Sequence, residues 1–294
     1  MNVLVTGASG LIGTRLVPVL RRAGHDVARA VRRAPARSDE IAWTPETGAL
    51  EPSRRFEAVV HLAGHSLASG RWTAALKRRA WSSRVDATRA LCERLRATAP
   101  PPTFVCASAV GVYGDRGEEP LDETSPPGTG FLAELARAWE DACAPLATST
   151  CRVVSMRLGL VLAREGGSLP RLLLPARLGL GGPLGNGRQF WSWVMLEDVL
   201  TAFERALLGS LRGPVNVVAP CPVRQRDFAI ALGRAIHRPA FWPVPSPVLR
   251  AILGEMADAM ILASARVAPR RLTEDGYRFH HPDLGPALRG LLGR

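Results

Sequence analysis

Three glycines near the start of the chain most constrain how it can fold. The segment MNVLV is a short apolar run that leads into Gly7, Gly10 and Gly13, and an amphipathic stretch follows. This order predicts a strand, a glycine turn and a helix. Gly7 permits a tight turn, Gly10 lets the backbone approach a phosphate, and Gly13 lets the helix pack closely on the sheet. Because a helix N-terminus offers free N–H groups, the turn predicts a site for a dinucleotide pyrophosphate.

The spacing of these glycines is G-x-x-G-x-x-G, not the commoner G-x-G-x-x-G. Glycines also punctuate ordinary turns, so the triplet alone is a weak signal. Its position after a strand and before a helix favours the binding interpretation over a purely structural one.

Strands and helices alternate through the first two thirds of the chain. Further strands are expected near residues 26–31, 58–62, 103–107 and 152–158, and long helices over 73–96 and 131–146. This alternation predicts an α/β fold, a Rossmann-type doubly wound parallel sheet with a smaller C-terminal substrate lobe. We expect a nucleotide-binding domain over 1–165 with a returning segment at about 189–219. Residues 166–188 and 220–294 would form the lobe.

The composition limits the classes of partner. The net charge is +12, from 38 Lys and Arg against 26 Asp and Glu, but the cations are spread along the chain and only Lys77 is a lysine. We therefore expect no nucleic-acid partner, although the positive field favours a phosphate-bearing ligand. An apolar run long enough for a membrane span and a basic leader segment are both missing from the sequence, so no membrane partner is expected. The expected partner is a small-molecule substrate, and the expected state is a monomer or homodimer.

Five cysteines are scattered without C-x-x-C spacing, at positions 92, 106, 143, 151 and 221. This pattern is typical of reduced thiols in a cytoplasmic protein. The histidines and cysteines show no metal-ligand spacing, and we expect no metal.

The chain resembles the extended branch of the short-chain dehydrogenase/reductase superfamily, in particular its epimerase-like "NAD-dependent epimerase/dehydratase" proteins. The matching segments are residues 6–13 (TGASGLIG), 59–64 (VVHLAG), 108–114 (SAVGVYG), 157–162 (RLGLVL), 178–189 (LGLGGPLGNGRQ) and 266–272 (RVAPRRL). The resemblance implies a nicotinamide cofactor on the sheet. It implies that the cofactor is bound by Gly7, Ser9, Gly10, Leu11, Ile12, Gly13, Leu62, Ala63, Gly64, Ser108 and Arg157.

The end of the second strand bears on which cofactor is bound. An NAD site carries an acid about 20 residues beyond the glycines, which binds the ribose 2′-OH. Here Arg32 and Arg33 follow Val31, and no acid is present. A guanidinium pair suits a 2′-phosphate, so we expect NADP, with NAD as the alternative. A solvated arginine pair is the other interpretation that stays open.

The catalytic pair of the superfamily is missing. Its members carry Tyr-x-x-x-Lys on a helix, but the tyrosines here are Tyr113 and Tyr277, and neither has a lysine four residues on. Leu132 and Ala136 occupy the positions of the pair. We expect Ser108, at the carboxyl end of a strand, to bind a substrate carbonyl, and Tyr113 to donate a proton. The alternatives are a satisfied strand-end hydroxyl for Ser108 and a loop-anchoring ring for Tyr113.

Four other residues carry weaker signals. His61 is expected to pack in the core, His65 to lie in a loop near the cofactor, and Asp198 to anchor a helix. Sugar-nucleotide epimerases carry an arginine where this chain has Trp191, which disfavours a nucleotide-sugar substrate. Aromatic residues there indicate either a more apolar site or packing between lobes.

The leading hypothesis is an NADP-dependent oxidoreductase that transfers a hydride to or from a small, rather apolar carbonyl or alcohol compound. One alternative is a cofactor-binding sensor or scaffold without turnover, which the missing pair favours. The other is an epimerase that uses a retained cofactor.

Overall fold

The computed structural model describes residues 1–52, 54–147 and 150–293, and these residues form two compact units. The first unit comprises Met1–Ser108, Leu135–Met156 and Leu200–Val215. The second comprises Ala109–Glu134, Arg157–Val199 and Asn216–Arg294. The domain boundaries expected from the sequence stay a prediction.

An eight-stranded sheet forms the centre of the first unit. Its strands are β1 (Asn2–Thr6), β2 (Asp26–Val31), β3 (Glu40–Thr44), β4 (Ala49–Glu51), β5 (Ala58–His61), β6 (Thr103–Ala109), β8 (Arg152–Leu158) and β12 (Gly213–Val217), in the order β12-β8-β6-β5-β1-β2-β3-β4. The pairs β1–β2, β1–β5, β2–β3 and β5–β6 are parallel, and β3–β4 is antiparallel. The expected α/β fold with a mostly parallel sheet is confirmed.

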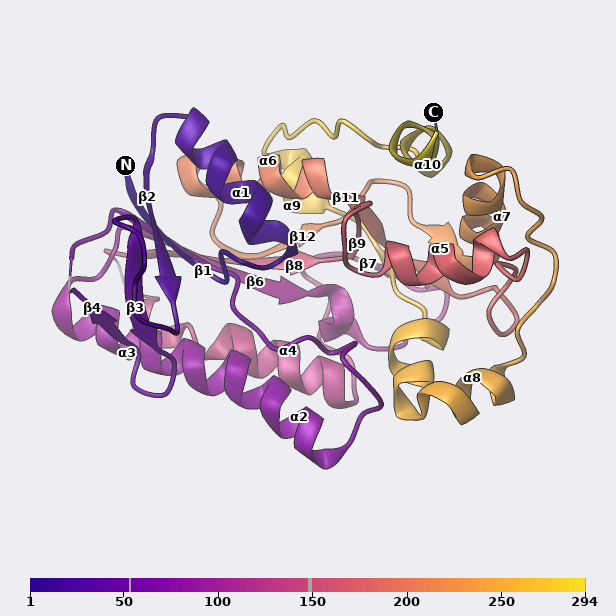
Figure 1. Cartoon of the computed structure of the whole chain (residues 1–294), viewed down its shortest axis with the longest axis horizontal. Coiled ribbons are helices and arrows are strands. Elements are labelled where there is room, and N and C mark those ends of the chain that lie inside the picture. The colour runs from indigo at the N-terminus through magenta and orange to yellow at the C-terminus, as the bar shows by residue number, and fades with distance from the viewer. Residues whose placement is uncertain (53, 148–149, 294) are drawn as a thin grey trace. The chain divides into compact units, whose positions relative to one another are not determined.

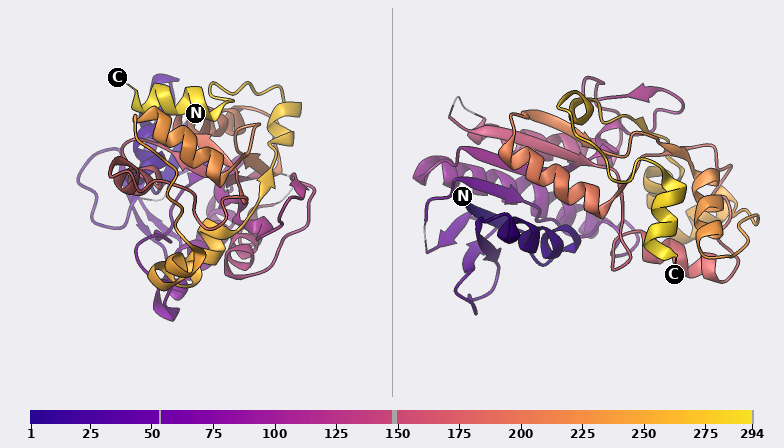
Figure 2. Two further views of the ribbon diagram at one scale, coloured as in Figure 1. Left: turned by 90° about the vertical axis from the view of Figure 1, so that its right-hand side faces the viewer. Right: turned by 90° about the horizontal axis from the view of Figure 1, so that it is seen from above.

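Helices cover both faces of this sheet. Figure 1 shows α1 (Leu11–Arg22) and α6 (Leu196–Leu208) on one face, and α2 (Ala74–Trp81), α3 (Ala87–Thr98) and α4 (Phe131–Asp141) on the other. The view from above in Figure 2 shows α1 and α6 over the same face. Helices on both faces bury the strands, which explains why β1 and β5 read as continuous apolar runs.

Both long helices expected from the sequence are interrupted. A π-helical turn (Ser82–Asp86) separates α2 from α3, and the Ser83 hydroxyl donates to the Ala80 carbonyl at 3.2 Å there. A serine hydroxyl that binds a carbonyl one turn back competes with the helical ladder. Helix α4 ends at Asp141, and a short 3₁₀ turn (Ala144–Leu146) follows. Pro145 lies in this turn and has no backbone N–H, so it cannot donate the hydrogen bond that would extend the α-helix.

The second unit is built from short strand pairs and helices. Its strands pair as β7 (Pro120–Leu121) with β14 (Arg266–Val267), β9 (Leu160–Leu162) with β11 (Trp193–Met195), and β10 (Phe190–Trp191) with β13 (Val223–Arg224). Its further helices are α5 (Leu169–Arg177), α7 (Gln225–Ala235), α8 (Ser246–Leu253), α9 (Arg270–Glu274) and α10 (Leu284–Leu292).

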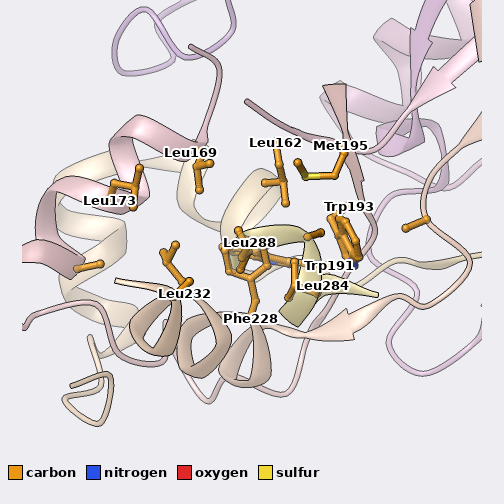
Figure 3. Packing of buried hydrophobic residues seen from close by; sticks show 14 residues of the cluster. Leu162, Leu169, Leu173, Trp191, Trp193, Met195, Phe228, Leu232, Leu284 and Leu288 are labelled. Atoms are coloured by element: carbon orange, nitrogen blue, oxygen red, sulfur yellow. The ribbon is translucent and has the colours of Figure 1, made fainter. Parts of the chain in front are cut away.

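The core of the second unit is rich in leucine and tryptophan. Figure 3 shows Leu162, Leu169, Trp193, Phe228 and Leu288 among the side chains that gather there. These residues come from β9, β11, α5, α7 and α10, so the unit buries one contiguous apolar cluster. None of the helices in the described part of the chain combines the length and hydrophobicity that a bilayer crossing requires.

Candidate cofactor and substrate site

The strand order reverses between β1 and β5. The chain runs outward from β1 to β2 and β3, and β5 then lies on the other side of β1. In open α/β sheets, ligands bind at the carboxyl ends of the strands where the order reverses. The two segments that leave this point are the glycine turn after Thr6 and the loop after His61, and these two residues are paired in register.

The glycine turn has the geometry of a close-packed phosphate loop. Gly7 has a φ of +67°, and a Cβ on it would lie 2.7 Å from the Leu62 carbonyl carbon. A Cβ on Gly13 would lie 2.3 Å from the Gly7 carbonyl oxygen. Neither position has room for a side chain. The structure therefore has the tight turn expected at Gly7 and the close packing expected at Gly13.

Gly10 is different because its surroundings are open. It is exposed and is the N-cap residue of α1, and a Cβ there would meet only the Gly7 carbonyl oxygen, at 3.2 Å. The first backbone N–H groups of the twelve-residue helix α1 follow directly, beginning with Leu11. An open backbone surface at a helix N-terminus fits an anionic pyrophosphate. Ser9 is exposed, and Leu11 and Ile12 are partly exposed beside it.

The loop after β5 lies against this turn. Leu62 and Ala63 are partly buried, and Gly64 is exposed. His61 is fully buried, with Nδ1 at 2.7 Å from the Thr6 hydroxyl and Nε2 at 2.9 Å from the Thr88 hydroxyl. Burial lowers the pKa of His61 to about 3, so the ring is neutral and packs in the core as expected.

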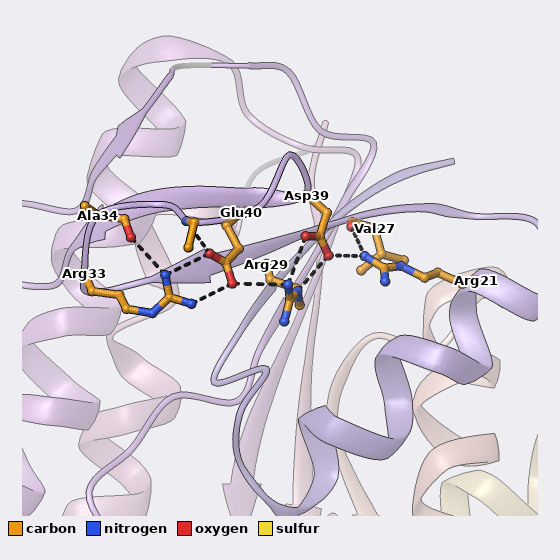
Figure 4. Close-up of polar contacts among 8 residues, drawn as sticks. Arg21, Val27, Arg29, Arg33, Ala34, Asp39 and Glu40 are labelled. Carbon is orange, nitrogen blue, oxygen red and sulfur yellow. Dashed lines mark hydrogen bonds and ion pairs between the residues drawn. The ribbon is translucent and has the colours of Figure 1, made fainter.

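An ion-pair cluster follows β2 (Figure 4). Arg33 binds Glu40 through both terminal nitrogens, at 2.8 and 2.9 Å, and Arg29 binds Asp39 at 2.8 Å and Glu40 at 3.2 Å. Glu40 is buried, and the Ala36 amide together with the Arg33 guanidinium holds its pKa below the usual value. Asp39 also binds Arg21. The pKa of Asp39 is lowered, mainly by its hydrogen bond with Arg29.

This cluster separates the two arginines expected to bind a 2′-phosphate. Arg33 is bound to Glu40, whereas Arg32 is exposed and is paired with no carboxylate in the described ranges. Asp39 and Glu40, the acids that follow β2 in the chain, are both bound by arginines, so neither is available to a ribose hydroxyl. The arrangement leaves Arg32 as the cation at this end of the strand.

Ser108 lies near the end of β6, two residues beyond Cys106, which pairs with His61. It is buried, and its Oγ donates a 2.6 Å hydrogen bond to Oε1 of Glu140 on α4. Ser108 is therefore at the carboxyl edge of the sheet, as expected, but it is linked to a carboxylate that the sequence did not single out for chemistry. A hydroxyl bonded to a carboxylate has an acceptor for its proton.

Tyr113 and Arg157 are both buried in the second unit. The Tyr113 hydroxyl lies 2.8 Å from Asn216 Oδ1 and 2.9 Å from the Asp122 carbonyl oxygen, and it accepts from Arg157 Nη1 at 2.9 Å. Burial is the main cause that raises the Tyr113 pKa above its usual value. A buried phenol with three polar neighbours supports the loop-anchoring alternative over proton donation by Tyr113.

The weaker candidates also have structural partners. The Asp198 carboxylate accepts from the backbone amides of His280 at 2.7 Å and His281 at 3.1 Å, so it anchors the C-terminal segment. His65 is partly buried, and its ring Nε2 lies 3.3 Å from the Ser69 hydroxyl.

Trp191 is buried against Phe228, with ring centroids 5.2 Å apart, and belongs to the core in Figure 3. Packing therefore explains Trp191, and this side chain does not indicate an apolar substrate.

A hollow of about 420 Å³ is lined by Asn2, Glu57 and Pro102, at the amino ends of β1, β5 and β6. It lies at the opposite edge of the sheet from the glycine turn. Ligands of such sheets bind at the carboxyl edge, so this hollow is not the candidate site.

A parallel sheet whose reversal point carries a glycine turn and a helix N-terminus defines a Rossmann-type fold, the class in which dinucleotides bind at this point. Residues 3–217 match the NAD dependent epimerase/dehydratase family, and residues 244–291 match a domain of unknown function (DUF1731). The chain belongs to the NAD-dependent epimerase/dehydratase family, within the extended short-chain dehydrogenases/reductases.

Similar proteins cover nearly the full length of the chain. Epimerase family protein Mb2239 of Mycobacterium bovis is 43% identical over 289 residues, which are 97% of this chain and 96% of that protein. The human epimerase family protein SDR39U1, crystallised with NADPH, has a TM-score of 0.92 and 35% identity, and 99% of each chain is covered. A UDP-galactose 4-epimerase structure has a TM-score of 0.76 at 19% identity over 100% of this chain and 98% of that chain, which shows a shared fold.

Proposed function

We propose that this protein binds NADPH and uses it to interconvert a small carbonyl compound and its alcohol, with Ser108 as the group that binds the reacting oxygen. The observation that carries the redox proposal is the 2.6 Å hydrogen bond from Ser108 to Glu140 at the carboxyl edge of the sheet. The cytoplasmic location of the protein and its monomeric or homodimeric state stay predictions.

The cofactor assignment is supported by the backbone cradle. Side chains are excluded at Gly7 and Gly13, while Gly10 faces open space at the N-terminus of α1. These residues fit a pyrophosphate, and Arg32 fits the 2′-phosphate that distinguishes NADPH from NADH. The similar human protein was crystallised with NADPH, which supports the same choice here.

The proton is handled by the chain's own residues. Bound NADPH supplies the hydride that the carbonyl carbon gains. Ser108 donates its proton to the carbonyl oxygen, and solvent then restores a proton to the Ser108–Glu140 pair. In alcohol oxidation the steps reverse: Ser108 takes the alcohol proton and passes its own to the Glu140 carboxylate. The hydrogen bond from Ser108 to Glu140 is oriented for this second direction.

A binding protein without turnover is the second candidate. The observation that favours it is the burial of Tyr113 among Asn216, Asp122 and Arg157, since the remaining phenol, Tyr277, donates to the Asp198 carbonyl oxygen at 2.8 Å. The tyrosine chemistry of the superfamily therefore has no counterpart in the described contacts of either tyrosine.

In the first step of the test, the purified protein is titrated with NADPH and with NADH, and binding is detected by calorimetry or by nicotinamide fluorescence. The NADPH-loaded protein is then mixed with benzaldehyde, acetophenone or phenanthrenequinone, and the nicotinamide absorbance is followed over a single turnover. The proposal expects NADPH to bind more tightly than NADH and the absorbance to fall with at least one carbonyl. Binding without any loss of absorbance supports the second candidate, and absence of binding contradicts both.

A further inference from the structure

The chain has no lysine at the position from which the superfamily pair holds the nicotinamide ribose. Ala136 occupies that position on α4 and is buried, and the single lysine, Lys77, lies on α2 near the ring of Trp72, at 5.9 Å from its centroid. A different cation is nevertheless present at the carboxyl edge of β5. It is Arg84, in the π-helical turn between α2 and α3.

Arg84 is held against the loop that follows β5. Its Nη1 donates to the His65 carbonyl oxygen at 2.8 Å, and its guanidinium lies over the Trp139 ring, 5.1 Å from the ring centroid. A Cβ on Gly64 would lie 3.0 Å from the guanidinium carbon, so the glycine makes room for this side chain. A π-helical turn inserts an extra residue and redirects the side chains that it carries, and such turns are frequent at functional sites.

The charge of Arg84 is not neutralised by the residues that surround it. Burial takes water away from the guanidinium and lowers the pKa of Arg84 to about 10, so the side chain remains a cation at neutral pH. No carboxylate in the described ranges lies within ion-pair distance of it. A half-buried guanidinium with one carbonyl and one ring as partners retains N–H groups for an acceptor-rich ligand.

We propose that Arg84 binds the nicotinamide half of NADPH, through the ribose hydroxyls and the adjoining phosphate, and so supplies the positive charge that the missing lysine supplies elsewhere in the superfamily. This inference rests on the proposed NADPH binding. Arg84 binds His65 and lies beside the Cβ position of Gly64, in the loop next to the glycine turn, and it contacts Trp139, the neighbour of Glu140. The same guanidinium therefore lies between the cofactor loop and the helix that positions Ser108.

The experiment measures affinities and needs no substrate. Three probes are titrated by calorimetry: NADPH, 2′-phospho-ADP-ribose, which lacks the nicotinamide ring, and adenosine 2′,5′-bisphosphate, which lacks the whole nicotinamide half. For Arg84→Met we expect affinity to fall about tenfold or more for the first two probes and to stay within about twofold for the third. Arg84→Lys should restore most of the loss, because it retains the charge.

A matched control is Arg152→Met. Arg152 is also a partly buried arginine with a lowered pKa, and it donates to the carbonyls of Ala206, Leu207 and Leu211 at 2.7–2.9 Å. It lies at the amino end of β8, so its loss should lower the melting temperature and leave all three affinities unchanged. A second variant, Gly64→Ala, keeps Arg84 but displaces its guanidinium, and it should weaken NADPH in the same probe-dependent way.

Several outcomes overturn the assignment. Unchanged NADPH affinity in Arg84→Met does so, and equal losses for all three probes assign Arg84 to the fold alone. A loss for NADPH only places Arg84 at the nicotinamide ring and contradicts the ribose and phosphate contact. If the wild-type protein binds no NADPH while its fold is intact, the proposed function fails together with this inference.

Discussion

Ser108 donates a 2.6 Å hydrogen bond to Glu140, although the two residues are 32 positions apart in the chain. Ser108 is near the end of a strand and Glu140 is near the end of a helix, so only packing of α4 on the sheet brings them together. The pair combines a hydroxyl that reaches the carboxyl edge with a carboxylate that can take or return its proton. It is therefore the candidate for the proton transfer that the absent tyrosine and lysine perform elsewhere.

Glu140→Gln should slow the chemical step by about a hundredfold. The amide oxygen still accepts the hydrogen bond from Ser108, but the amide neither takes nor returns a proton. We expect the folded structure and the NADPH affinity to be unchanged. The single-turnover rate with the carbonyl probe that reacts fastest measures the effect. Glu134→Gln, an exposed change in the first turn of the same helix, is the control, and a wild-type rate in Glu140→Gln would contradict the relay.

Gly10→Ala and Gly13→Ala should have different effects. A methyl group on Gly13 meets the Gly7 carbonyl oxygen at 2.3 Å, so we expect a loss of stability of about 2 kcal/mol or more. A methyl group on Gly10 meets that oxygen at 3.2 Å and otherwise projects into open space, so the fold should survive while NADPH binding weakens at least tenfold. Chemical denaturation and calorimetry separate the two effects. Gly290→Ala, which has open surroundings, is the control, and a Gly10→Ala protein with full affinity would refute the phosphate role.

Arg32→Glu should distinguish the two nicotinamide cofactors. An acid in place of the exposed Arg32 repels a 2′-phosphate, so NADPH affinity should fall between about tenfold and a hundredfold while NADH affinity is retained. Arg33→Gln should have a smaller effect, because Arg33 is already bound to Glu40. Parallel titrations with both cofactors measure the difference. Equal losses for NADPH and NADH would contradict the assignment of Arg32.

His61 should make the protein less stable in mild acid. The unfolded chain takes up a proton at His61 below about pH 6.5, whereas burial delays protonation in the folded state until about pH 3. Stability therefore falls as the pH falls from 6.5 toward 3, by at most about 1.4 kcal/mol for each pH unit from this residue. Denaturant unfolding of His61→Gln over the same range should show a shallower slope. Identical slopes for His61→Gln and wild type would disprove the buried-neutral assignment of His61.

The sequence predicted the elements that local rules control. The glycine turn after Thr6 requires a positive φ at Gly7 and a missing side chain at Gly13, and both requirements are properties of a few consecutive residues. The strands over 26–31 and 152–158 have the bounds that their apolar pattern predicts. The family assignment also followed from motifs that are contiguous in the chain.

The tertiary structure decided which side chains have partners. It buried Tyr113 among three polar groups, bound Arg33 to Glu40, and placed Trp191 in the core. It also interrupted the helix expected over 73–96 with a π-helical turn that directs Arg84 toward Gly64.

These contacts join residues that are distant in the chain, and their formation depends on how helices pack on the sheet. Periodicity and turn chemistry carry information about neighbours within a few residues, and they carry none about such packing. The amino-acid sequence alone therefore determined the sheet, the glycine turn and the absence of the tyrosine–lysine pair. The pairing of Ser108 with Glu140 and the position of Arg84 were determined only when the chain was folded.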